Sequence, residues 1–115
     1  KIVLQRGRNK IKNVLEYLKK EKLIDNYGLV KSDIVLKTAI LINGPCIIGL
    51  PAYNTTEQFW KGTGKTQGHA VSLIGWDTSG FIIRNSWGYD WGNLGNTILP
   101  YEDFNKVLEI WTLIK

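Results

Sequence analysis

Apolar residues recur at helical spacing in the first half of the chain and predict two helices. The first stripe consists of Ile11, Val14, Leu15 and Leu18. Its i, i+3, i+4, i+7 spacing predicts an amphipathic helix over about residues 9–22. Ser32 and Asp33 suit the N-cap of a second helix that runs to about residue 42, before Asn43-Gly44-Pro45. Apolar residues cover most of the circumference of this second helix, so we expect it to be largely buried.

Shorter apolar runs follow and predict a sheet. Strands are expected near residues 46–50, 69–76, 81–86, 94–99 and 109–114. Asp77-Thr78-Ser79-Gly80 is rich in residues that tolerate a sharp reversal, so residues 76 and 81 are expected to pair across a hairpin. Residues 50–68 form a long irregular connection, and loops of that length are often functional. Helices followed by antiparallel strands predict an α+β domain.

The hairpin places the only histidine near an asparagine. Pairing of residues 76 and 81 sets His69 opposite residues 85–88. Ile83, Asn85 and Trp87 share one face of their strand because side chains alternate. The asparagine can accept the ring N–H and fix the tautomer, the tryptophan can cover that bond, and Gly68 leaves room for close approach.

Each of these residues has a simpler interpretation when it is taken alone. A histidine at a strand edge is usually solvated or satisfied, and an asparagine close to a glycine usually belongs to a turn. Their joint placement, directly before the Trp-Gly-x-x-Trp-Gly stretch of residues 87–92, favours a site.

Four motifs together resemble the papain-like cysteine peptidases. Gly68–Trp76 resembles the catalytic histidine motif of that family, and Asn85–Gly92 resembles its asparagine motif. Asn43-Gly44-Pro45 before an apolar run resembles its central strand, and Leu99–Phe104 resembles an ending found in bacterial and viral members. The resemblance covers about residues 30–115, and the first 30 more weakly.

The resemblance implies a fold and a division of the chain. The expected fold is the C-terminal, histidine-bearing and asparagine-bearing half of a papain-like domain, with one or two helices on a mostly antiparallel, barrel-like sheet. Residues 1–115 would form one domain, with residues 1–30 a basic helical lead-in and residues 31–115 the sheet core.

The resemblance also implies roles. His69 would be the general base and, as imidazolium, the partner of a thiolate. Asn85 would orient it and Trp87 would shield their bond. Gly68 would lie at the substrate cleft, and Gly49 would line a specificity pocket. The implied reaction is thiolate attack on a peptide carbonyl, so the expected partner is a peptide or protein substrate.

The nucleophile of the family is not visible. The family places a cysteine, followed by tryptophan, at the N-terminus of a helix, with a glutamine a few residues earlier, whereas Gln5 has no cysteine near it. Cys46 is the only cysteine, follows Gly44-Pro45 and opens an apolar strand, so we interpret it as a buried structural residue. A peptidase whose nucleophile lies outside this chain is therefore expected.

An alternative is an inactive papain-like domain that serves as a structural or binding component of a larger assembly, such as a virus particle. The absent nucleophile favours this alternative. Asn96 also departs from the family, which usually has an aromatic residue after the glycine at position 95, and this change is expected to alter surface packing rather than chemistry.

Composition limits the partners. The net charge is +5, with the basic residues concentrated between Lys1 and Lys22, and we interpret them as a solvated helix face rather than a nucleic-acid surface. Residues 62–66, Gly-Thr-Gly-Lys-Thr, lack the first glycine of a phosphate loop, so no nucleotide site is expected. One histidine and one cysteine match no metal-ligand spacing, and no cofactor is expected.

Localisation is constrained by the single cysteine, which excludes a disulfide within the chain. We therefore expect a reducing compartment such as the cytoplasm, or a particle assembled there. No apolar run of membrane-spanning length or signal peptide is visible, so no membrane partner is expected. The chain begins at Lys1 and contains no methionine, so we expect a fragment or a matured product, with a missing N-terminal half or a larger assembly as a partner.

Overall fold

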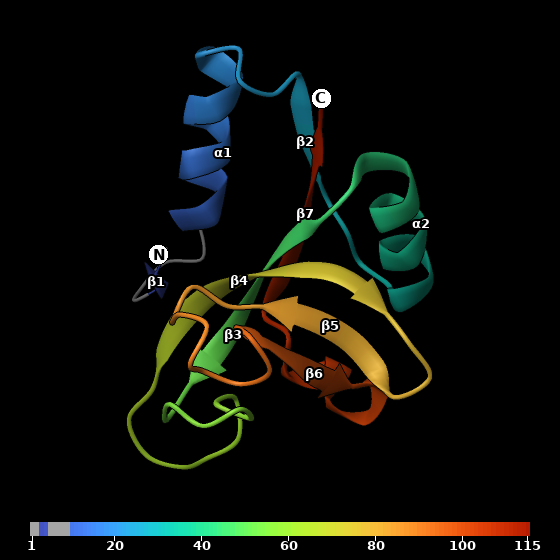
Figure 1. Cartoon of the computed structure of the whole chain (residues 1–115). Coiled ribbons are helices and arrows are strands. Elements are labelled where there is room, and N and C mark those ends of the chain that lie inside the picture. The colour runs from blue at the N-terminus through green and yellow to red at the C-terminus, as the bar shows by residue number, and fades with distance from the viewer. Residues whose placement is uncertain (1–2, 5–9) are drawn as a thin grey trace.

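The computed structural model describes residues 3–4 and 10–115. Its elements in chain order are β1 (Val3–Leu4), α1 (Lys10–Lys20), β2 (Asn26–Leu29), α2 (Asp33–Asn43), β3 (Cys46–Ala52), β4 (Gln67–Trp76), β5 (Gly80–Arg84), β6 (Asn96–Pro100), the 3-10 helix η1 (Tyr101–Lys106) and β7 (Glu109–Ile114) (Figure 1). Helices packed on a sheet confirm the predicted α+β class.

The described strands form one antiparallel sheet in the order β2-β7-β3-β4-β5-β6, and β1 pairs with the beginning of β4. Strand β3 therefore lies between the last strand, β7, and the histidine-bearing strand, β4. The β4–β5 hairpin has the predicted pairing of Trp76 with Phe81. Asp77 closes its turn, because its Oδ1 accepts the backbone N–H of Ser79 at 2.7 Å.

Apolar residues on the two faces of the sheet belong to two separate clusters. One face carries the larger cluster, which includes Leu36 and Ile40 of α2. Ile11 and Leu15 of α1 pack with Ala70 on the other face. Figure 1 accordingly shows α1 and α2 on either side of the β2–β7 ribbon. Helices α1 and α2 therefore pack against opposite faces of the sheet.

Helix α2 begins and ends as predicted but is not largely buried, so that prediction is wrong. Ser32 caps it, with Oγ accepting the backbone N–H of Val35 at 3.1 Å, and Gly44 ends it at a φ of 88°. Ile34 and Leu41 are each 75% exposed. Only one side of the helix can face the sheet, and no other described element lies over the opposite side.

The long connection is shorter and better packed than the sequence suggested. Strand β3 continues to Ala52 and β4 begins at Gln67, leaving residues 53–66 irregular. Within them Phe59 and Trp60 are fully buried in the larger cluster. Three short elements, β1, β2 and η1, were not predicted from the sequence. Neither described α-helix is long and apolar enough to cross a membrane.

Candidate functional site

A buried hydrogen bond joins the only histidine to the predicted asparagine. His69 lies near the start of β4 and is 1% exposed, and Asn85 directly follows β5 and is 6% exposed. The distance between His69 Nε2 and Asn85 Oδ1 is 2.9 Å. The predicted contact between these two side chains is present in the structure.

The backbone at Ser86 fixes the direction of this bond. The N–H of Ser86 can only donate, and it lies 2.8 Å from the same Oδ1 atom of Asn85. This atom must therefore be the amide oxygen, so it accepts from His69 as well, and Nε2 carries the hydrogen. The imidazole is held as the Nε2–H tautomer, which leaves Nδ1 as the ring nitrogen able to gain a proton.

Aromatic rings enclose the pair. Trp87 stacks on the imidazole with ring centroids 4.8 Å apart and planes 13° apart. Phe59 approaches the imidazole at 5.5 Å with planes 74° apart, and it also meets Trp87 edge-on at 5.2 Å. Apolar rings exclude water, and a hydrogen bond in a medium of low dielectric constant is stronger than one in water. The cover therefore favours one fixed orientation of the ring.

Tight turns in residues 85–95 place Trp87 over His69. The N–H of Asn85 donates to the carbonyl of Gly95 at 2.9 Å, which closes the segment into a loop. Gly92 has a φ of 60°, and a Cβ there would collide with the carbonyl oxygen of Asn96. Trp91 fastens the loop to the residue 53–66 connection by donating from Nε1 to the carbonyl of Thr55 at 2.8 Å. The spacing of the Trp-Gly-x-x-Trp-Gly motif thus follows from its turn geometry.

The other two glycines predicted from the sequence lie on β4 and β3. Gly68 precedes His69 and pairs with Pro51. Gly49 pairs with Ala70 on one side and Glu109 on the other. Since Ala70 packs under α1, Gly49 lies on the opposite face of the sheet from His69. The structure thus brings together His69, Asn85 and Trp87, but not Gly49.

Sequence reasoning missed Phe59. The residue lies in an irregular segment that carries no strand or helix period, so periodicity gave no reason to place it in the core. The only sequence signal was the aromatic pair Phe59-Trp60 inside an otherwise polar stretch. Exposed loops seldom carry two adjacent large aromatic residues, so the pair indicated burial.

Cys46 lies on the same face as His69 but far along the strands. Leu50 is the residue opposite His69, whereas Cys46 is opposite Leu73. Four residues of strand separate the two positions by roughly 13 Å, which is too far for a thiolate–imidazole pair. Cys46 is fully buried, and burial raises the pKa of its thiol, with a smaller opposing effect from a hydrogen bond to Thr112.

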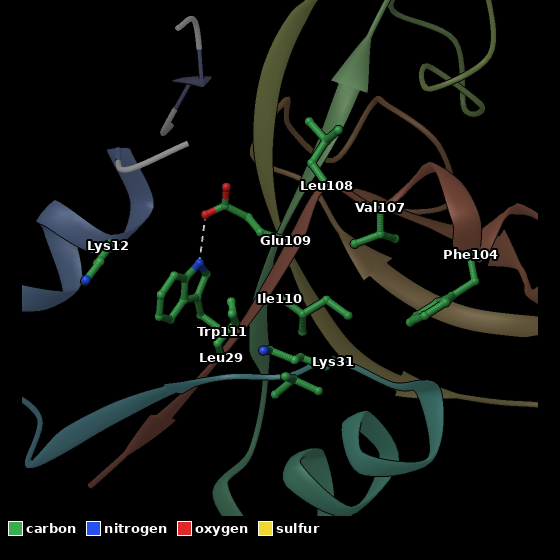
Figure 2. Close-up of a pocket in the computed structure, with 10 residues that line it drawn as sticks. Lys12, Leu29, Lys31, Phe104, Val107, Leu108, Glu109, Ile110 and Trp111 are labelled. Carbon is green, nitrogen blue, oxygen red and sulfur yellow. Dashed lines mark hydrogen bonds between the residues drawn. The ribbon is translucent and has the colours of Figure 1, made fainter. Parts of the chain in front are cut away.

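Several hollows lie on the described surface, and two of the larger ones differ in their distance from the site. One, of about 590 Å³, borders the aromatic rings and is lined by Ala52, Tyr53, Asn54, Thr55, Gln67, Trp87 and Trp91. The other, of about 540 Å³, lies between α1 and β2–β7 (Figure 2), where Trp111 Nε1 donates to Glu109 Oε1 at 2.7 Å. The first shares Trp87 with the histidine–asparagine site, and a smaller hollow of about 270 Å³ is lined in part by Ala70, Asn85 and Ser86. In the described part of the chain no three acidic, cysteine or histidine residues gather as a metal site.

The arrangement can accept and return a proton at an oriented imidazole. The neutral amide of Asn85 can hold the ring in both its neutral and its protonated form, because Nε2 carries a hydrogen in each. The site therefore suits general base and general acid catalysis beside a nucleophile. Cys46 is too distant to be that nucleophile.

Comparison with known proteins gives a consistent result. The family profile described as papain family cysteine protease matches residues 6–106. Cysteine proteinase 3 of Entamoeba histolytica is 30% identical over 109 residues, which cover 84% of this chain and 34% of that protein. A probable cysteine proteinase, 224L, of Invertebrate iridescent virus 6 is 27% identical, covering 81% of this chain and 31% of its own length.

A solved structure shows the same fold. Xylellain, a cysteine protease from Xylella fastidiosa, superposes with a TM-score of 0.63 and 29% sequence identity, over 80% of this chain and 40% of its own. The chain thus spans about a third of the length of the two curated relatives and two fifths of xylellain.

Proposed function

Because the chain belongs to the papain family of cysteine proteases, we propose that it supplies the histidine and asparagine of a peptide-hydrolysing site. We place the nucleophilic cysteine of that site outside these 115 residues. The observation that carries the proposal is the His69–Asn85 hydrogen bond, which is buried under Trp87 and has its direction fixed by Ser86.

Each residue has a defined part in the reaction. His69 takes the thiol proton at Nδ1, and the resulting imidazolium pairs with the thiolate. The thiolate attacks the carbonyl carbon of the substrate. His69 then returns the proton to the leaving amine as the C–N bond breaks, which leaves an acyl-enzyme. In the second half His69 takes a proton from water, the hydroxide attacks the thioester, and the thiol is regenerated.

Asn85 and Trp87 act on the histidine rather than on the substrate. The Asn85 oxygen keeps Nε2 protonated and the ring pointing in one direction throughout, because the bond persists in both protonation states. Trp87 stacks on the imidazole and shields that bond from water. The neutral asparagine leaves the positive charge of the imidazolium available to the thiolate.

The proposed substrate is a peptide or protein in an extended conformation. The hollow bordered by Trp87 and Trp91 is open and lies beside the site. Gly68 is adjacent to His69 and has no side chain, and it is proposed to lie at the substrate cleft. Gly49 is proposed to line a specificity pocket beside the small Ala70, on the opposite face of the sheet and separate from this hollow.

A second candidate is a catalytically inactive domain that has a structural or binding task in a larger assembly. The observation that favours it is the single cysteine, which is buried and roughly 13 Å along the strands from His69. The two candidates differ in one respect, namely whether a reactive thiol reaches Nδ1 of His69.

The deciding experiment treats the native polypeptide, isolated from its source under reducing conditions, with a thiol-reactive epoxide. Mass spectrometry of its peptides then identifies the labelled residue. Labelling of a cysteine other than Cys46, lost in a His69→Ala variant, supports the peptidase. Folded material that remains unlabelled refutes the peptidase and favours the inactive domain. Labelling at Cys46 would contradict both the distance argument and the assignment of the nucleophile.

A further inference from the structure

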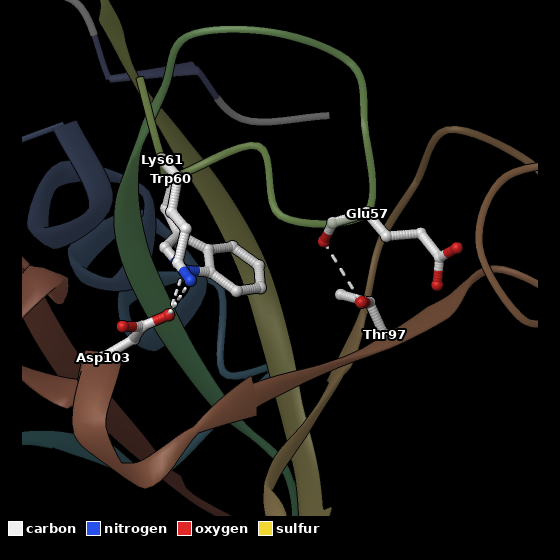
Figure 3. Close-up of polar contacts among 5 residues, drawn as sticks. All are labelled: Glu57, Trp60, Lys61, Thr97 and Asp103. Carbon is white, nitrogen blue, oxygen red and sulfur yellow. Dashed lines mark hydrogen bonds and ion pairs between the residues drawn. The ribbon is translucent and has the colours of Figure 1, made fainter. Parts of the chain in front are cut away.

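The Leu99–Phe104 motif contributes no residue to the histidine–asparagine pair, yet it contains a buried carboxylate. Asp103 in η1 is 8% exposed. Its Oδ2 accepts the indole N–H of Trp60 at 3.0 Å and lies 3.5 Å from the ammonium group of Lys61 (Figure 3). A buried carboxylate is costly unless it is hydrogen-bonded or paired, and here the two partners are consecutive residues of one irregular segment.

Trp60 connects this carboxylate to the site. Its ring meets Phe59 edge-on at 5.2 Å, and Phe59 in turn contacts His69 and Trp87. All of these side chains except Trp87 are at most 1% exposed. A close-packed interior transmits displacement from one ring to the next. A shift of Trp60 would therefore change the position of Phe59 against the imidazole.

Other contacts hold different parts of the same segment. Thr97 donates to the carbonyl of Glu57 at 3.1 Å, and Trp91 donates to the carbonyl of Thr55. Both bonds lie on the N-terminal side of Phe59. The C-terminal side contains Trp60 and Lys61, whose side chains both contact Asp103. Asp103 is thus the side chain outside the segment that contacts both Trp60 and Lys61, while Asn54 within the segment donates from Nδ2 to the carbonyl of Lys61 at 2.9 Å.

We propose that Asp103 is a positioning residue for His69, acting through Trp60 and Phe59. Its bond to the indole keeps Trp60 in place, Trp60 keeps Phe59 against the imidazole, and Phe59 with Trp87 keeps the ring aligned with Asn85. The importance of this for turnover rests on the proposed function, whereas the effect on the ring itself does not. The Leu99–Phe104 motif then belongs to the site although none of its residues touches the histidine.

The test uses nitrogen NMR of the imidazole in the 115-residue chain, where a single histidine makes the signals unambiguous. In the unaltered chain we expect a protonated Nε2 and slow exchange of its hydrogen. Asp103→Leu leaves the indole N–H without its acceptor. We expect this variant to exchange the Nε2 hydrogen about tenfold faster and its two ring nitrogen shifts to converge.

Asp103→Asn is the conservative variant, because its amide oxygen can still accept from Trp60. We expect it to restore the unaltered signals, with exchange within about twofold of the parent. Tyr101→Phe is the matched control in the same η1 helix, since it removes only the bond from its hydroxyl to the carbonyl of Asp77. It should leave the histidine signals unchanged. A folded Asp103→Leu variant with unchanged signals would overturn the proposal, and so would an equal disturbance in Tyr101→Phe.

If Asp103→Leu does not fold, Phe59→Leu decides the question, because it changes the ring that contacts His69 while it keeps an apolar side chain. Faster exchange at Nε2 in Phe59→Leu supports the chain of contacts, and unchanged exchange refutes it. Labelling by the epoxide in the native polypeptide separates this result from the proposed function. Unlabelled native material with disturbed histidine signals in the variants would refute the peptidase and leave Asp103 as a positioning residue.

Discussion

The two ends of the β3–β4 pair each bury a chemically reactive side chain, but in different surroundings. His69 lies opposite Leu50 at one end, and Cys46 lies opposite Leu73 at the other, on the same face of the sheet. His69 has a hydrogen-bond acceptor in Asn85 and aromatic rings around it. Cys46 is surrounded by the larger apolar cluster.

This difference shows that burial by itself does not indicate function. Both side chains are almost inaccessible to solvent. Burial raises the pKa of the Cys46 thiol and so keeps it neutral and unreactive. The histidine instead has its tautomer selected and its ring direction fixed. A reactive group is prepared for chemistry by directed partners, and the predictions below test that distinction.

The largest effect is expected at the histidine. In a polypeptide that carries the nucleophile, His69→Ala should lower kcat by about 10⁴-fold or more, because both proton transfers are lost. Asn85→Ala keeps the proton acceptor but loosens its orientation, so the expected loss is about 100-fold. Steady-state hydrolysis of a fluorogenic peptide measures both. Equal turnover in the parent and the His69→Ala variant would eliminate His69 as the base.

The aromatic cover gives the next effect. Phe59→Ala removes a fully buried ring, so we expect the free energy of unfolding to fall by about 3–5 kcal/mol. Leu41→Ala, on the exposed side of α2, is the control and should stay within about 0.5 kcal/mol of the parent. Urea unfolding followed by tryptophan fluorescence gives both values. A small loss at Phe59 would mean that residues 53–66 do not pack on the site in solution.

Local patterns were enough to predict much of the sheet and of the site. Turn residues and strand period placed Trp76 opposite Phe81, but a β-bulge between Leu73 and Gly75 then shifts the register by one residue and brings Asn85 to the face that carries His69. These contacts depend on residues close in sequence, joined by a tight hairpin, so few arrangements compete. The cap at Ser32 was predicted for the same reason, since capping depends on a single turn of backbone.

Long-range packing could not be predicted from local sequence patterns. Apolar composition predicted that α2 would be largely buried, but a helix is buried only where a partner covers it, and the sequence does not say how many partners exist. Phe59 reaches His69 through a segment without periodicity, and Asp103 binds Trp60 across 43 positions of the sequence. Such contacts depend on the final fold and leave no regular spacing in the chain.

Substitutions at Cys46 test the other end of the comparison with a smaller effect. Cys46→Ala should leave turnover of the active polypeptide unchanged and cost about 1 kcal/mol of stability through lost apolar contact. Cys46→Ser places a hydroxyl in the apolar cluster and should cost about 1–3 kcal/mol. Chemical unfolding and peptide hydrolysis measure the two effects. Complete loss of turnover in a folded Cys46→Ala variant would identify Cys46 as the nucleophile after all.

The smallest effect is a pH dependence that comes from the same thiol. Burial raises the pKa of Cys46 above its ordinary value of 9.0, so between the two values the unfolded chain releases a proton that the folded chain retains. The contribution of the neutral thiol to stability is therefore complete below about pH 9 and is lost as the pH rises, with a slope of at most about 1.4 kcal/mol per pH unit.

Urea midpoints between neutral pH and about pH 10 should fall more steeply for the parent than for Cys46→Ala. The lysine and tyrosine residues are common to both proteins, so subtraction isolates the thiol. Identical slopes would mean that the thiol ionises as easily in the folded chain as in the unfolded one, and the contrast between the two ends of the strand pair would then rest on the histidine alone.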